Sequence, residues 1–67
     1  MKTMMMFDVI LENETHDEII TTITEVNVKK AMLEFCEMVM EGGERFGNHL
    51  IMSGDRYYFK PIKMIKY

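Results

Sequence analysis

Cysteine is nearly absent from the chain, and this scarcity limits how the fold can be stabilised. Cys36 is the only cysteine, so no disulfide can form within the chain. A lone free cysteine favours a reducing compartment, so we expect the cytoplasm, or the host cytoplasm if the protein is viral. One small core rarely supplies more than about 3–5 kcal/mol. We therefore expect homo-oligomerisation, most simply a dimer, or folding with a partner to add stability.

Long hydrophobic runs are also missing. No stretch approaches the roughly 18 apolar residues of a membrane helix, so we expect no membrane contact. The methionine-rich start is interrupted by Asp8, and no small-residue cleavage site follows it, which argues against a signal peptide. The chain is short enough for one compact domain over residues 1–67, and it begins with Met1, so we expect a complete gene product.

The residue patterns of common catalytic and metal sites are absent. His16 and His49 have no Cys, His or carboxylate neighbours at metal-ligand spacing. Cys36 has apolar and acidic neighbours along a helix, which favour a neutral thiol. Gly42-Gly43 lacks the Lys-Ser/Thr pair of a phosphate loop. Since so small a chain hardly encloses a pocket, we expect no enzyme, no metal and no cofactor.

Alternation of side chains predicts a first strand from Thr3 to Leu11. A period of two is typical of a strand whose faces differ in character. One face is apolar, and it consists of Thr3, Met5, Phe7, Val9 and Leu11. The other face carries Met4, Met6, Asp8, Ile10 and Glu12. A polar turn follows over residues 12–17.

The segment from Glu18 to Val26 is rich in β-branched residues, which fit a pleated sheet better than a helix. We predict a second strand here, antiparallel to the first. A short helix is the alternative, because Thr15 and Glu18 have the spacing of a capping box and three isoleucines could line a helical face.

A helix is predicted from Val28 to Glu41, with Asn27 as its N-cap. Its core-facing stripe consists of Val28, Ala31, Met32, Phe35 and Val39, and its solvated face of Lys30, Glu34, Glu37 and Glu41. Gly42-Gly43 is expected to end the helix, because glycine adopts the left-handed conformation at low cost.

The sequence after the helix predicts a loop over residues 44–48 and a third strand from His49 to Ser53. A hairpin turn at Gly54-Asp55 is expected to lead into a fourth strand from Arg56 to Tyr67. Pro61 lacks an amide donor, so the last strand should lie at an edge or be bulged there. The predicted fold is α+β: a four-stranded antiparallel sheet with one helix on one face, in the order β-β-α-β-β.

Two apolar surfaces exceed what a monomer core needs. On the helix, Leu33, Cys36 and Met40 form a second stripe beside the core stripe. On the sheet, Met4, Met6 and Ile10 lie on the face that a single helix leaves uncovered. Nine of the 67 residues are methionine, whose flexible thioether adapts to irregular contact surfaces. We predict that both surfaces bind a protein partner or a second copy.

Charge is distributed unevenly along the chain. Residues 1–55 carry eleven acidic and four basic side chains, a net −7, whereas residues 56–67 carry four basic side chains and no acid, which gives the total of −3. The basic segment interleaves aromatic residues, as in surfaces that hold single-stranded nucleic acid. The candidate nucleic-acid residues are Arg56, Tyr58, Lys60, Lys63 and Lys66.

These patterns favour a small non-enzymatic protein-binding modulator that acts stoichiometrically, as an inhibitor or antitoxin-like factor. In size and layout alone, the chain is similar to the small stand-alone proteins with which bacteriophages block host enzymes, toxins or defence complexes. No motif carries that similarity, so no residue roles are transferred. The alternative is a small nucleic-acid-binding protein that uses the basic C-terminal strand.

Overall fold

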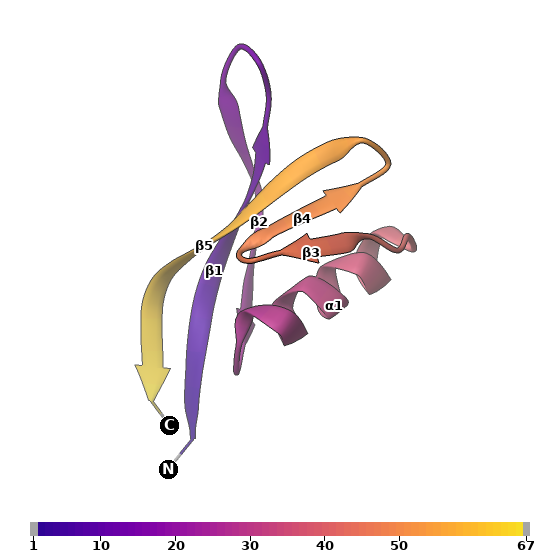
Figure 1. Ribbon diagram of the computed structural model, residues 1–67. Helices are drawn as coiled ribbons and strands as arrows, with labels where there is room; N and C mark the ends of the chain where they lie inside the picture. The colour runs from indigo at the N-terminus through magenta and orange to yellow at the C-terminus, as the bar shows by residue number, and fades with distance from the viewer. Residues whose placement is uncertain (1, 67) are drawn as a thin grey trace.

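The computed structural model describes residues 2–66, and within this range the chain forms one helix and a single five-stranded sheet (Figure 1). The elements are β1 (Thr3–Glu12), β2 (Asp17–Glu25), α1 (Val28–Val39), β3 (Glu44–Phe46), β4 (His49–Met52) and β5 (Asp55–Lys66). The sheet is antiparallel throughout, in the order β2-β1-β5-β4-β3. The predicted α+β class is confirmed, but the predicted number of four strands and the order β-β-α-β-β are wrong, because three strands and not two follow the helix. No helix within residues 2–66 is long and apolar enough to cross a membrane.

The hairpin of β1 and β2 follows the predicted alternation. Phe7 and Val9 are buried on one face of β1, whereas Met6 and Ile10, which point to the other face, are only partly buried. The segment after the turn is a strand and not the alternative short helix; it pairs with β1 from Asp17 to Glu25. Its β-branched side chains pack in a pleated surface without the rotamer loss that a helix would impose.

Strand β5 is central for part of its length and an edge for the rest. Its first residues, Asp55–Tyr58, pair with β4, while residues 56–66 pair with β1 on the other side. The register with β1 shifts between Phe7, opposite Pro61, and Met6, opposite Lys63. The bulge predicted at Pro61 is therefore confirmed. Figure 1 shows that β5 bends along its length. Tyr67, which was included in the predicted strand, lies outside the described residues.

Helix α1 begins as predicted and ends differently. The Asn27 side chain accepts a hydrogen bond from the Lys30 amide at 2.9 Å. At the other end Met40, and not a glycine, adopts the left-handed conformation, with φ 58° and ψ 40°. The amides of Met40 and Glu41 donate to the carbonyls of Glu37 and Cys36, which closes the helix two residues earlier than predicted.

The segment predicted as a loop contains β3. Glu44, Arg45 and Phe46 pair with Ile51, Leu50 and His49 of β4. This strand has no apolar alternation, so only the backbone hydrogen bonds to β4 define it. Gly47, at φ 60°, forms the tight turn between the two strands.

The hairpin turn between β4 and β5 is shifted by one residue from the prediction. Met52 pairs with Asp55, so the two turn residues are Ser53 and Gly54. Both have positive φ, 52° and 83°, which is the requirement of a type I′ turn. Asp55, predicted in the turn, instead opens β5.

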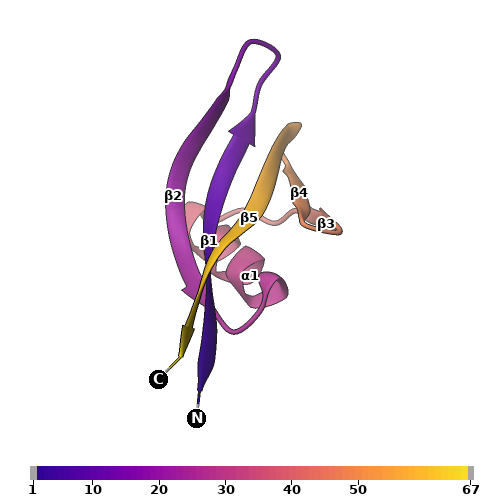
Figure 2. The ribbon, with the colours of Figure 1, turned by 90° about the vertical axis from the view of Figure 1, so that its left-hand side faces the viewer.

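The core lies between α1 and one face of the sheet, and Figure 2 looks onto the strands from the side that α1 does not cover. Helix residues Ala31, Met32 and Phe35 are buried against strand residues Phe7, Val9, Ile23, Leu50, Met52 and Phe59. The Phe35 ring meets Tyr57 and Phe59 edge-on, at centroid distances of 5.1 and 5.9 Å. Val39, predicted in the core stripe, is 43% exposed because it is the last helical residue, one turn beyond Phe35.

Gly43 is required for close approach and not for ending the helix. A Cβ atom at this position would lie 2.8 Å from the backbone oxygen of Ile51 and 3.1 Å from a Leu50 methyl group. We expect Gly43→Ala to lower the free energy of unfolding by about 1–3 kcal/mol, because the strand backbone must move to relieve the overlap. Urea unfolding measures this. Gly42→Ala is the matched control, since nothing lies within 4 Å of its Cβ position; equal losses for both variants would contradict the assignment.

Met40 stores backbone strain at the helix end. An L-residue in the left-handed region costs about 1–2 kcal/mol, which glycine avoids at some cost in chain entropy. We expect Met40→Gly to raise the free energy of unfolding by about 0.5–1 kcal/mol. The control is Met38→Gly, two residues earlier and within α1, which should lower stability by about 1 kcal/mol. A loss of stability in both variants would show that Met40 makes contacts that outweigh its strain.

Candidate protein-interaction surfaces

The face of the sheet away from α1, here called the open face, is covered by no other element within residues 2–66. Residues that pair directly across antiparallel strands point to the same side, so the registers define its members. They are Met4, Met6, Asp8, Ile10 and Glu12 of β1, Asp17, Ile19, Thr22 and Thr24 of β2, Arg56, Tyr58, Lys60, Lys63 and Ile65 of β5, His49 and Ile51 of β4, and Glu44 and Phe46 of β3. The three residues predicted on the uncovered sheet surface, Met4, Met6 and Ile10, lie together in the middle strand of this half of the sheet.

Two acids of the open face, Asp8 and Glu12, make polar contacts with side chains of neighbouring strands. The Thr22 hydroxyl donates to the Asp8 carboxylate at 3.0 Å. His49 Nε2 lies 3.2 Å from Glu12 Oε1, and the His49 ring stacks on Tyr58 at a centroid distance of 5.0 Å. His49 and Glu12 are far apart in the sequence, so the spacing of residues around His49, which shows no carboxylate at metal-ligand distance, could not predict this pair.

A hollow of about 370 Å³ opens beside this pair. Phe46, His49, Ile51 and Arg56 line it. Phe46 is 55% exposed, so β3 places a large aromatic ring at the rim of the open face. Phe46 was not identified as a residue of this surface, because residues 44–48 were predicted to form a loop and a loop does not fix the direction of its side chains.

The basic C-terminal strand presents most of its charges on one side. Arg56, Tyr58, Lys60 and Lys63 all belong to the open face. Lys66 pairs with Thr3 and therefore points to the side of the sheet on which α1 lies. The bulge at Pro61 shifts the alternation so that Lys60 and Lys63, three positions apart, share a face.

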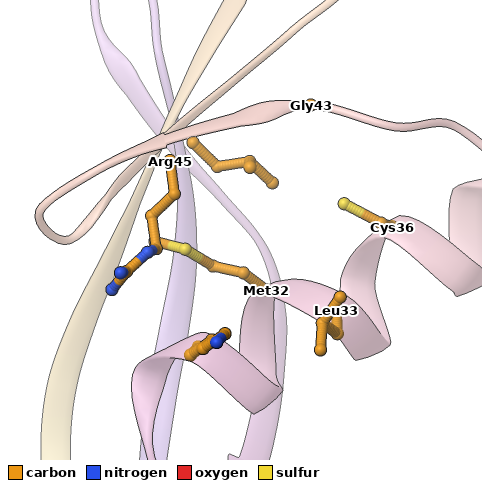
Figure 3. Close-up of a pocket in the computed structure, with 7 residues that line it drawn as sticks. Met32, Leu33, Cys36, Gly43 and Arg45 are labelled. Atoms are coloured by element: carbon orange, nitrogen blue, oxygen red, sulfur yellow. The ribbon is translucent and has the colours of Figure 1, made fainter.

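The second helical stripe is divided by the structure. Leu33 is 57% exposed, Cys36 is half-buried against the core, and Met40 is 89% exposed beyond the helix end. Leu33 and Cys36 line a groove of about 160 Å³ between α1 and β3, here called the α1–β3 groove (Figure 3). Met40 is not part of it.

The α1–β3 groove combines an apolar lining with two cations. Its lining residues are Lys29, Met32, Leu33, Cys36, Gly43, Arg45 and Leu50. Figure 3 shows the Arg45 side chain reaching from β3 towards the helix side of the groove. Arg45 pairs with the buried Leu50, which fixes it on the side of the sheet that faces α1. The sequence offered one signal for this site: Lys29 and Arg45 are two of only four basic residues in the first 55.

The Cys36 thiol is held in its neutral form. Desolvation by the surrounding side chains raises the pKa of Cys36 above the ordinary value for a thiol. Desolvation likewise raises the pKa of the Tyr57 hydroxyl, with further contributions from the charges of Asp55 and Glu41. Within residues 2–66, no three His, Cys, Asp or Glu side chains lie close enough together to hold a metal ion.

Comparison with known proteins gives no family assignment. The chain matches no protein-family model, and it shows no significant similarity to a curated protein or to a solved structure.

Proposed function

We propose that this chain is a non-enzymatic, protein-binding modulator that acts stoichiometrically in the cytoplasm and associates through its open face. The observation that carries the proposal is the one-sided covering of the sheet by a single helix (Figure 2). Within residues 2–66 eleven large hydrophobic residues are exposed, and three of them, Ile19, Ile51 and Phe46, lie on the open face beside the partly buried Met4, Met6 and Ile10. A surface so rich in exposed apolar groups is typical of proteins that bury part of it against a partner.

A second copy of the chain is the occupant that the open face fits best. Its apolar centre consists of Met4, Met6 and Ile10, with Asp8 between Met6 and Ile10 on β1, and it is flanked by Glu12 and by the bases Arg56, Lys60 and Lys63. A surface that carries both signs beside an apolar centre is complementary to its own copy across a two-fold axis. A dimer would also add burial to a core that is small for an independently stable domain.

Dimerisation through the open face has a direct test. We expect sedimentation velocity to show a dimer at micromolar concentration, and Met6→Lys to weaken association by about tenfold or more, because a cation would be buried in the apolar centre. Glu34→Lys on α1, away from the open face, is the matched control and should leave the dimer intact. Circular dichroism establishes that each variant is folded. A monomer at all concentrations, or equal effects of the two substitutions, would contradict the dimer.

A second candidate function is supported by a separate observation. Arg56, Tyr58, Lys60 and Lys63 share the open face, next to the stacked His49 ring and the exposed Phe46 ring. Cations that alternate with aromatic rings on a sheet surface are how single-stranded nucleic acid is held. This function uses the same surface as the dimer, so the two occupants compete.

Nucleic-acid binding predicts a strong dependence on salt. A fluorescent single-stranded oligonucleotide of mixed sequence should bind at low ionic strength, and affinity should fall steeply as salt rises. Lys63→Glu should weaken binding about tenfold or more, whereas Lys66→Glu, on the other side of the sheet, should have a smaller effect. Equal effects at the two positions, or no binding at low salt, would remove this candidate.

A further inference from the structure

The α1–β3 groove lies beside an unpaired strand edge. β3 is the last strand of the sheet and pairs only with β4 among the described strands. The backbone groups of Glu44–Phe46 that point away from β4 are therefore available for another strand. A strand added at this edge would direct alternate side chains towards α1 and into the groove.

The groove has the size for one aliphatic side chain. Its volume is about 160 Å³, well below the roughly 300–1,000 Å³ of pockets that hold drug-sized molecules. Met32 and Leu50, which are 3% and 2% exposed, are buried lining residues, and Leu33 and Cys36 add apolar wall from the helix. An apolar side chain placed here would complete the packing of these groups.

The charge of the groove opposes that of its surroundings. Residues 1–55 carry a net −7, yet Lys29 and Arg45 both line this groove. A carboxylate on the ligand would find two cations here, one of them a guanidinium suited to bidentate contact. Glu37 on α1 and Glu41, two residues beyond its end, are exposed acids that would repel the same ligand, which confines an acidic segment to the groove.

We infer that the α1–β3 groove binds an extended acidic segment of a target protein. The segment adds a strand to β3, places an aliphatic side chain over Met32 and Leu50, and directs a carboxylate two residues away to Arg45 and Lys29. This inference rests on the proposed protein-binding function but uses a different surface from the open face. A dimer joined through its open faces would present two such grooves.

Methyl NMR of the methionines tests the inference on the intact chain. The probe is an acetylated, amidated Thr-Leu-Thr-Glu-Thr peptide, which carries leucine and glutamate on the same side when extended. Met32 reports on the groove, while Met4 and Met6 report on the open face. We expect the Met32 signal to shift on titration up to millimolar peptide while the Met4 and Met6 signals stay in place. The peptide with lysine in place of glutamate should bind at least about fivefold more weakly.

Two variants separate the groove from the general charge of the helix. Arg45→Glu should weaken peptide binding at least about fivefold, and this residue is solvent-exposed, so the fold should survive. Lys30→Glu makes the same charge change next to Lys29, but Lys30 does not line the groove. It should leave binding unchanged. Amide spectra establish that both variants are folded.

The outcomes distinguish this inference from the proposed function. An unmoved Met32 signal, an equal response to the lysine peptide, or equal effects of Arg45→Glu and Lys30→Glu would overturn the groove site. Shifts confined to Met4 and Met6 would also overturn it, while leaving the open face as a protein-binding surface. A chain that is monomeric by sedimentation but shows the expected Met32 response would retain the groove and lose the open-face dimer.

Discussion

The packing of Phe35 against Tyr57 and Phe59 determines where the single helix lies. α1 follows β2 in the chain, with only residues 26 and 27 between them, yet its central aromatic ring meets β5, two strands away in the sheet. Edge-on contact of aromatic rings adds directional preference to the burial of large apolar surface. This contact holds α1 across one face of the sheet, and the other face stays without a cover.

Both candidate surfaces are consequences of that placement. A helix of 12 residues cannot cover both sides of the sheet, so apolar and charged side chains of β1 and β5 remain together on the open face. The same placement brings α1 alongside the last strand, β3, and leaves the α1–β3 groove between them (Figure 3). The open face carries both signs of charge around an apolar centre, whereas the groove is cationic on an acidic body. The two surfaces are therefore suited to different occupants, and use of one leaves the other free.

Local patterns were sufficient to predict most of the elements. Period-two alternation in residues 3–11, the β-branched run after residue 18 and the Asn27 cap each depend on neighbours within a few positions. The bulge at Pro61 was also predictable, because a missing amide hydrogen disrupts a ladder in any tertiary context. The incorrect predictions concern residues whose conformation depends on contacts with distant parts of the chain. β3 has too few apolar residues to be recognised, and its three residues become a strand only because β4 lies beside them. Met40 adopts a conformation that its side chain disfavours, which local propensity could not predict.

Which side chains share a face of a strand or of the helix follows from the order of the residues alone, because those periodicities are properties of the backbone. For this reason Met4, Met6 and Ile10 lie on one side of β1, and Arg56, Tyr58 and Lys60 lie on one side of β5. Which faces meet depends instead on how the strands and the helix pack together. The close approach of His49 and Glu12, and the lining of one groove by Arg45 and by residues of α1, bring together residues that are distant in the chain. They depend on strand order and register, which the whole sheet and its core fix together.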